Sequence, residues 1–186
     1  RPWRRGFVNS LQTINLADQG GVDRGPGFPI GDGRESRARL AKLQGIWSAG
    51  LVKLAEAVAA APAHVRARAE ANWRNAKSFG NSVEVTLRFT RWLQARQRLL
   101  DARTAQEKLI ACDELEHVGR EELAAARNAL PMYLRDSKLG YFNCGRGVFT
   151  AQTIIEKIDQ LQRTLERELP AMRTDASRPD TAVRKD

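Results

Sequence analysis

The residues best suited to chemistry begin with a glutamate and a histidine three positions apart, Glu114 and His117. On a helix this spacing puts both side chains on one face, and carboxylate di-metal sites in helical bundles use the same Glu-x-x-His pair. Such a site also needs a second Glu-x-x-His pair and two further glutamates on facing helices. The other histidine, His64, has Ala61 at the matching position. The sequence therefore predicts neither a metal site nor a bound cofactor.

Motifs for phosphate binding or nucleophilic catalysis are also missing from the sequence. No Gly-x-x-x-x-Gly-Lys loop occurs, and Gly145-Arg-Gly147 is too short for a dinucleotide fingerprint. Cys112 and Cys144 are far apart, and neither belongs to a Cys-x-x-Cys pair, so they predict no disulfide framework or zinc site. Cys112 is instead expected in the core of a helix.

The segment from Asp136 to Thr150 departs most from a helix-forming composition. Its three glycines within eight residues indicate turns at positive φ or close approach to another surface, and its aromatic rings can anchor the loop. Five of its side chains are candidate polar contacts for a ligand or partner: Asp136, Lys138, Tyr141, Asn143 and Arg146. In the alternative interpretation Asp136 caps a turn, Tyr141 and Phe142 plug the end of a helical bundle, and Arg146 is solvated.

The tryptophans are a second set of candidate binding residues. Trp47 and Trp73 lie on the apolar faces of predicted helices, so they are expected in the core. Trp92 lies within a run of arginines where cation–π stacking or partner contact is expected: Arg88, Arg91, Arg96 and Arg98. A basic face with interleaved aromatics is typical of nucleic-acid binding, but Phe89 and Trp92 equally fit the second buried face of a central helix.

The length of 186 residues suits one domain with a substantial core. The 31 Lys and Arg against 22 Asp and Glu give a net charge of +9, which attracts nucleic acid, an anionic surface or an acidic partner. Most of these basic residues stand beside acidic residues, so a solvated surface of mixed charge is the simpler prediction. No apolar run approaches the roughly 20 residues of a membrane span.

Residues 1–34 are expected to form an irregular arm or linker, because glycines and prolines interrupt any helix or strand pattern. The arm nevertheless carries eight large apolar side chains, so we expect it to pack on this domain or on a neighbour: Trp3, Phe7, Val8, Leu11, Ile14, Leu16, Phe28 and Ile30. This arm, and a first residue other than Met, suggest a segment of a larger protein, although a processed or trimmed N-terminus would give the same pattern.

Apolar residues three and four positions apart predict a first helix from Glu35 to Ala61, ended by Pro62. A second helix should run from about Ala63 to Arg103. Gly80, within Gly-Asn-Ser, is a candidate break or kink in this helix. Without that break the helix would be about 60 Å long at about 1.5 Å per residue.

Thr104 is predicted to cap a third helix, with Glu107 as its capping-box partner, and Pro131 to kink or end it. Thr150 should cap a last helix that stops at Pro170, leaving a flexible polar tail over 171–186. Four long amphipathic helices with short connections predict an all-α domain over 35–170, an antiparallel bundle.

The order of features from Glu121 onward resembles the end of certain large bacterial glycoside-hydrolase-like proteins. The shared features are a helix with Glu121-Glu122, then Leu130-Pro131, the hexamer Asp136-Ser-Lys-Leu-Gly-Tyr141, a glycine loop and a helix of the form Ile155-Glu-Lys-Ile-x-x-Leu161. In those proteins a catalytic TIM barrel precedes a helical region that ends in an Asp-Ser-Arg-Leu-Gly-Tyr-His element. This chain has Lys138 in place of Arg and Phe142 in place of His.

The resemblance implies a noncatalytic accessory domain that packs on a catalytic barrel and borders its saccharide cleft, with the carboxylate pair for glycoside hydrolysis on the barrel. Its partner would be a neighbouring catalytic domain or a partner chain, and saccharide would be a further ligand. The alternative hypothesis is a free-standing basic module that binds nucleic acid or another anionic partner through the Arg88 to Arg103 face.

Overall fold

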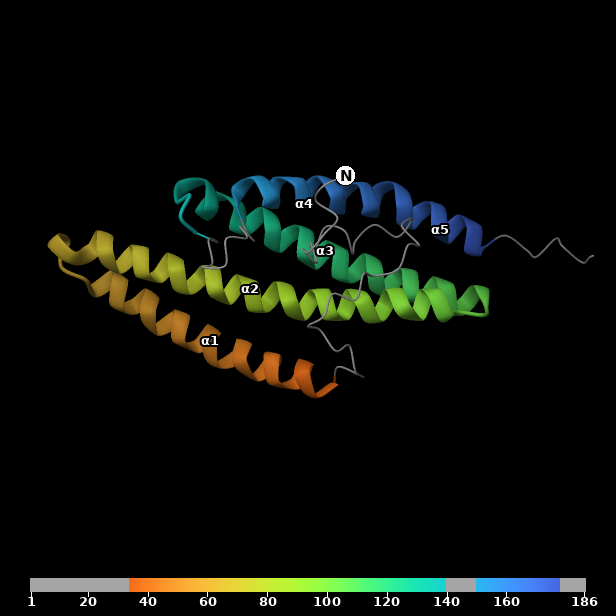
Figure 1. Ribbon diagram of the computed structural model, residues 1–186, viewed down its shortest axis with the longest axis horizontal. Coiled ribbons are helices and arrows are strands. Elements are labelled where there is room, and N and C mark those ends of the chain that lie inside the picture. Colours follow the sequence, from red (N-terminus) through yellow and green to blue (C-terminus); the bar gives the residue numbers. More distant parts are fainter. Residues whose placement is uncertain (1–33, 140–149, 178–186) are drawn as a thin grey trace, which may run out of the picture.

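The computed structural model of the chain describes residues 34–139 and 150–177. It shows long helices that pack side by side, each running opposite to its neighbour (Figure 1). The helical segments are α1 (Arg34–Ala60), α2 (Ala63–Asp101), α3 (Ala105–Arg135), α4 (Ala151–Arg163), the π-helical turn η2 (Thr164–Glu168) and α5 (Leu169–Ala176). The predicted all-α antiparallel bundle is confirmed. The predictions made for the arm, for Cys144 and for the glycine loop beyond residue 139 lie outside the described residues.

The first two helices match their predicted limits closely. Pro62 separates α1 from α2 and stands at the N-cap of α2, where its missing N–H costs no helical hydrogen bond. The possible break at Gly80 is not formed, and α2 is one helix of 39 residues. A Cβ at Gly80 would lie 2.9 Å from Cδ1 of Trp47. The glycine therefore lets α1 approach α2 closely.

Both predicted N-caps are confirmed. The Thr104 hydroxyl accepts from the Glu107 backbone N–H at 3.1 Å, and the Glu107 carboxylate accepts from the Thr104 N–H at 3.0 Å. Thr150 and Thr153 form the same reciprocal arrangement at the start of α4. Each cap satisfies backbone donors that the first helical turn leaves without a partner.

The two later prolines do not end their helices. Pro131 lies inside α3, which continues to Arg135. The prediction that Pro170 stops the last helix is wrong, because the π turn η2 precedes it and α5 continues through Ala176. The Leu169 N–H donates to the Thr164 carbonyl across this wider turn. Residues 171–176, expected in the tail, are therefore helical.

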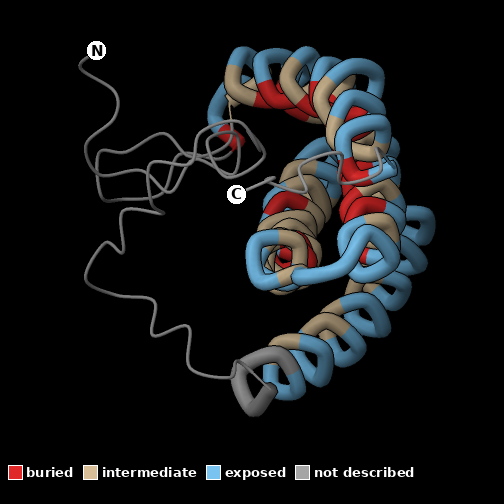
Figure 2. The backbone as a smooth tube through the Cα atoms, turned by 90° about the vertical axis from the view of Figure 1, so that its right-hand side faces the viewer, coloured by how far each residue is buried: buried red, intermediate tan, exposed pale blue. Residues whose placement is uncertain are grey.

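Each helix packs on its neighbour in the sequence. The helix α3 contacts α2 on one side and α4, η2 and α5 on the other, whereas α1 packs against α2 alone among the described helices. Figure 2 shows α1 and α4 at opposite ends of this array. The main core lies between α2, α3 and the C-terminal helices, and its buried members are Trp92, Ala95, Cys112, Leu115, Val118, Leu161, Leu165 and Leu169.

Candidate functional site

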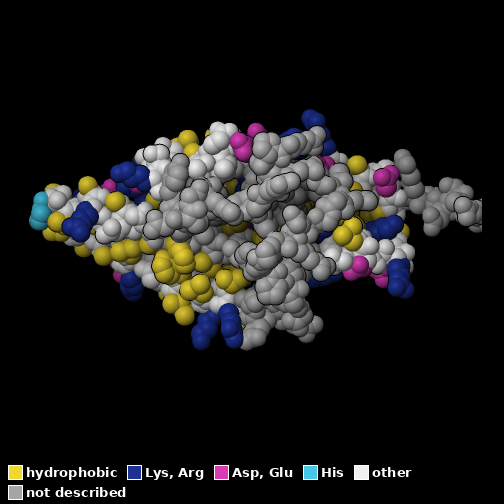
Figure 3. Space-filling view, in the orientation of Figure 1, with side chains coloured by type: hydrophobic (Ala, Val, Ile, Leu, Met, Phe, Trp, Pro, Cys, Tyr) yellow, Lys and Arg dark blue, Asp and Glu magenta, His cyan; other side chains and the backbone are white. Residues whose placement is uncertain are grey.

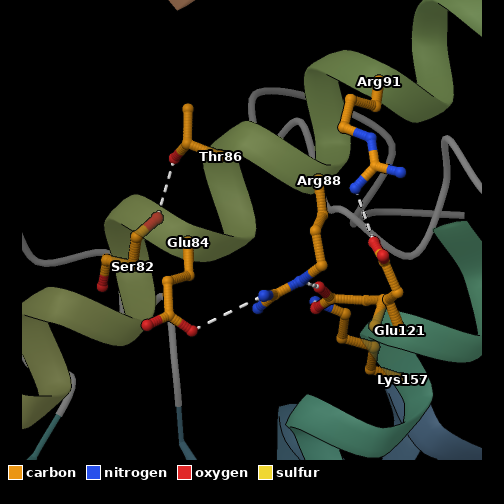
Figure 4. A network of polar contacts seen from close by, with 8 residues as sticks. Ser82, Glu84, Thr86, Arg88, Arg91, Glu121 and Lys157 are labelled. Carbon is orange, nitrogen blue, oxygen red and sulfur yellow. Dashed lines mark hydrogen bonds and ion pairs between the residues drawn. The ribbon is translucent and has the colours of Figure 1, made fainter. Parts of the chain in front are cut away.

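Three charged side chains from three helices meet in the interior. The Glu122 carboxylate of α3 accepts hydrogen bonds from the Lys157 ammonium of α4 and the Arg88 guanidinium of α2. Figure 4 shows Arg88 extended toward Lys157, with Glu84 reaching Arg88 from the preceding turn of α2 at 3.5 Å. Lys157 is 4% exposed and Glu122 is 6% exposed. We call Arg88, Glu122 and Lys157 the charged cluster.

The charged cluster is costly to bury, and Lys157 shows the cost most clearly. Desolvation lowers the pKa of Lys157, and the neighbouring Glu122 carboxylate opposes this effect. A lysine ammonium has three N–H donors. Within the described residues Glu122 is its one hydrogen-bonding acceptor. The Lys157 ammonium can therefore donate to a further acceptor.

The charged cluster lines a groove of about 320 Å³ between α2, α3 and α4. The α3 wall is mainly apolar and includes Ala125, Ala126, Ala129 and Met132. The α2 wall is polar and aromatic and includes Trp73, Lys77, Asn81 and Glu84. The groove thus combines an apolar side, a polar side and buried charges.

Tyr133 closes one part of the groove as a fixed wall. Its hydroxyl is 2.9 Å from the Ser78 hydroxyl, and only 3% of the residue is exposed. Burial raises the pKa of Tyr133, while the hydrogen bond to Ser78 opposes that rise. The phenol therefore stays neutral and joins α3 to α2.

A second feature is an exposed apolar surface on α1 and α2. We define the hairpin surface as Leu43, Ile46, Trp47 and Phe79, and the exposed Lys42 lies one helical turn before Ile46 on α1. Ile46 is 62% exposed and Phe79 is 38% exposed, and the Phe79 ring centroid lies 4.6 Å from that of Trp47. Figure 3 shows hydrophobic side chains gathered over α1 and the adjoining part of α2, with basic side chains beside them.

The expected packing role of Trp47 fits its contacts. Its indole N–H donates to the Ala76 carbonyl of α2 at 2.8 Å, and its ring covers Gly80. The side chain is nevertheless only half-buried, as is Trp73. Trp47 therefore ties α1 to α2 at the edge of the fold rather than in its main core.

Positive charge is concentrated in the same hairpin. Residues 34–80 contain nine Lys and Arg against three Asp and Glu, whereas residues 102–177 contain eleven against twelve. The first stretch therefore carries a net charge of +6 out of the total of +9. The hairpin surface lies on the basic half of the molecule.

Of the five candidate polar contacts near the end of α3, the structure describes only Asp136 and Lys138. The Asp136 carboxylate lies 3.4 Å from Nε of Arg74 and also accepts from the Lys138 backbone N–H at 3.2 Å. These contacts fit the alternative in which Asp136 caps a turn. Lys138 is exposed. Tyr141, Asn143 and Arg146 lie outside the described residues.

The structure corrects the surface interpretation of Trp92. This indole is 3% exposed in the main core, so α2 is a central helix with a second buried face. Its arginines reach acidic residues of α3: Arg88 pairs with Glu122, Arg91 with Glu121 and Arg98 with Glu114. This face therefore serves helix packing, which weighs against its proposed use in nucleic-acid binding.

The Glu-x-x-His pair is also engaged elsewhere. Glu114 pairs with Arg98, and His117 Nε2 lies 3.1 Å from Glu121. Over residues 34–139 and 150–177, no three His, Cys, Asp or Glu side chains form a group that could hold a metal ion. None of the helices in those ranges is long and apolar enough to cross a membrane.

Glu122 and Lys157 were not predicted as site residues, and Arg88 was predicted only as part of a basic face, although the sequence carries a signal for Lys157. Lys157 falls between Ile154 and Leu161 at helical spacing, within the apolar stripe of its helix. A lysine in such a stripe needs a buried partner. Glu122 could not be identified as that partner because the pairing crosses between helices.

No protein-family model, curated protein or solved structure matches this chain. Function must therefore follow from the groove, the charged cluster and the hairpin surface themselves.

Proposed function

We propose that this chain is a noncatalytic docking domain whose hairpin surface binds an acidic face of another folded domain. The observation that carries the proposal is the position of α1, which packs on α2 alone among the described helices and yet exposes Ile46 and Leu43. An exposed apolar cluster edged by charged residues is typical of a protein interaction site. Docking would bury this cluster and use no reacting side chain.

Glycine in α1 supports the same role. A Cβ added at Gly50 would meet no described atom within 4 Å, whereas one at Gly80 or Gly119 would press on neighbouring side chains. A glycine inside a helix costs about 1 kcal/mol relative to alanine. Packing among the described residues does not explain that cost at Gly50, but close approach of a partner backbone would.

The net charge of the hairpin specifies the chemistry of the partner. The exposed Lys42 lies one turn before Ile46 on α1, on a stretch with a net charge of +6, whereas Lys53 of the same helix is paired with Glu56 at 3.0 Å. Complementary charge speeds encounter and selects the partner, while the apolar centre supplies most of the binding free energy. An acidic protein face with an apolar centre is therefore the expected occupant.

The resemblance of the Asp136 to Tyr141 hexamer to glycoside-hydrolase-like proteins makes a catalytic barrel the first partner to test. In that case the chain would be an accessory domain of a carbohydrate-active protein, and saccharide would be held by the barrel. The likeness is confined to that hexamer and the order of the surrounding features.

The proposal is tested by photocrosslinking in the cells that make the protein. A benzophenone amino acid replaces Ile46, and in a matched control it replaces Ile110, which is 55% exposed on α3. Position 46 should crosslink to an acidic segment of a folded domain with at least fivefold greater yield than position 110. Lys42→Glu should reduce that yield at least fivefold, because it opposes the partner's charge.

Three outcomes would contradict the proposal. Equal yields at positions 46 and 110 would mean that the hairpin surface has no partner. Crosslinks to nucleic acid would favour the basic-module hypothesis, and crosslinks to lipid would favour a membrane surface.

A further inference from the structure

We propose that the groove between α2, α3 and α4 binds a small organic carboxylate, whose anionic group accepts a hydrogen bond from Lys157. This ligand site is separate from the docking role of the hairpin surface. The proposal rests on three features that meet in one place: a buried donor, an excess of positive charge and an apolar wall.

The donor is the Lys157 ammonium. It is 4% exposed and its one acceptor within the described residues is Glu122. A buried ammonium is stable only when other groups replace the hydrogen bonds it made to water. A ligand carboxylate in the groove would supply a second, charge-assisted acceptor.

The charges that face the groove favour an anion. Three cations line it, Lys77, Arg88 and Lys157, against two carboxylates, Glu84 and Glu122. The charged side chains around the groove therefore sum to +1. Glu122 already accepts from two of the cations, so a bound carboxylate would balance the remaining charge.

The walls define the rest of the ligand. Ala125, Ala129 and Met132 of α3 and Ile154 of α4 offer apolar contact, and the Trp73 ring lines the α2 side. A groove of about 320 Å³ is near the small end of the range for ligand pockets, about 300–1,000 Å³. The ligand should therefore be a monocarboxylate with a short aliphatic or aromatic body, rather than a bare anion.

The test uses the whole chain labelled with 13C at the lysine side chains, and hexanoate as the probe. Hexanamide has the same apolar body without the charge, and inorganic phosphate has charge without the apolar body. Hexanoate should shift the Lys157 Cε resonance saturably. Hexanamide and phosphate should each bind at least tenfold more weakly.

Two variants connect the binding to the charged cluster. Lys157→Met keeps the volume of the side chain and should weaken hexanoate binding at least tenfold, measured by calorimetry. Lys108→Met removes an exposed lysine of α3 outside the groove and should leave binding unchanged. Circular dichroism of both variants establishes that they are folded.

Several results would overturn the proposal. One is the absence of a saturable shift with hexanoate, which would leave the spare Lys157 donors to water. Equal binding of hexanamide would show that the charged cluster plays no part. If phosphate bound as tightly as hexanoate, the groove would be a simple anion site. If folded Lys157→Met bound hexanoate with unchanged affinity, the carboxylate of hexanoate would not contact Lys157.

Discussion

The Glu122 carboxylate lies against the Lys157 ammonium in the interior, and this pair joins α3 to α4. Glu122 is also the acceptor of Arg88, so one buried anion compensates two cations from two other helices. The three members of the charged cluster should therefore contribute unequally to the stability of the fold. Removing the anion leaves the buried Lys157 ammonium without its acceptor and next to the half-buried Arg88, which keeps only Glu84, whereas removing Lys157 leaves the Arg88–Glu122 pair intact.

This difference between the members of the charged cluster predicts that Glu122→Gln and Lys157→Met change the stability differently. Glu122→Gln should lower the free energy of unfolding by about 3 kcal/mol or more, because it leaves buried charge uncompensated. Lys157→Met should leave the stability unchanged or raise it, because Arg88 still balances Glu122 and desolvation of the ammonium is avoided. Urea unfolding at pH 7 measures both. Equal losses in the two variants would contradict the shared-anion arrangement.

The pKa of Lys157 predicts how stability changes with pH. The folded state lowers this pKa below its ordinary value of 10.5, so the unfolded chain binds the proton more tightly. Between the two pKa values the unfolded state holds more protons, and stability rises with pH. The wild-type protein should therefore gain stability relative to Lys157→Met as the pH rises toward 10.5. A relative loss over that range in chemical unfolding would show that the sign is wrong.

Two glycines form a matched pair for testing the packing. A Cβ at Gly119 would lie 3.0 Å from Cδ2 of Leu165 and 3.2 Å from Cζ3 of Trp92, so Gly119→Ala should destabilise by about 1–3 kcal/mol. A Cβ at Gly50 meets nothing, so Gly50→Ala in the chain without a partner should stabilise by about 0.5–1 kcal/mol. Thermal unfolding of both variants checks the contrast. A stabilising Gly119→Ala would mean that α3 does not approach Trp92 this closely.

The last helix is predicted to depend on one arginine. Arg173 of α5 lies 2.6 Å from both Asp113 and Glu116 of α3. Arg173→Ala should speed amide exchange in α5 while the main core stays protected, with a loss of about 0.2–1 kcal/mol, since these ion pairs are partly exposed. Unchanged exchange in α5 would show that Leu169 and Met172 hold it without the ion pairs.

Local signals in the sequence predicted most helix boundaries. Pro62, Thr104 and Thr150 act within one turn of the chain, so their effects are visible in the sequence itself. The prediction that Pro170 ends the last helix failed because η2 changes the backbone hydrogen bonds just before the proline, and a π turn has no clear sequence signal.

The candidate site was harder to predict than the fold. Trp92 looked equally suited to a surface and to a core, because the glutamates that pair with its neighbouring arginines come from α3. The charged cluster likewise depends on which helices become neighbours. Amphipathic periodicity identifies the buried face of a helix but not the helix that covers it.

Amide hydrogen exchange of α1 tests the docking role most directly, in the protein purified from the cells that make it. Ile46→Asp changes an exposed side chain on the hairpin surface, and Ile110→Asp is its matched control on α3. Amides 41–53 should exchange at least tenfold faster in Ile46→Asp than in the wild type, because the partner no longer covers them, and Ile110→Asp should match the wild type. Identical exchange over 41–53 in all three proteins would contradict docking through the hairpin surface.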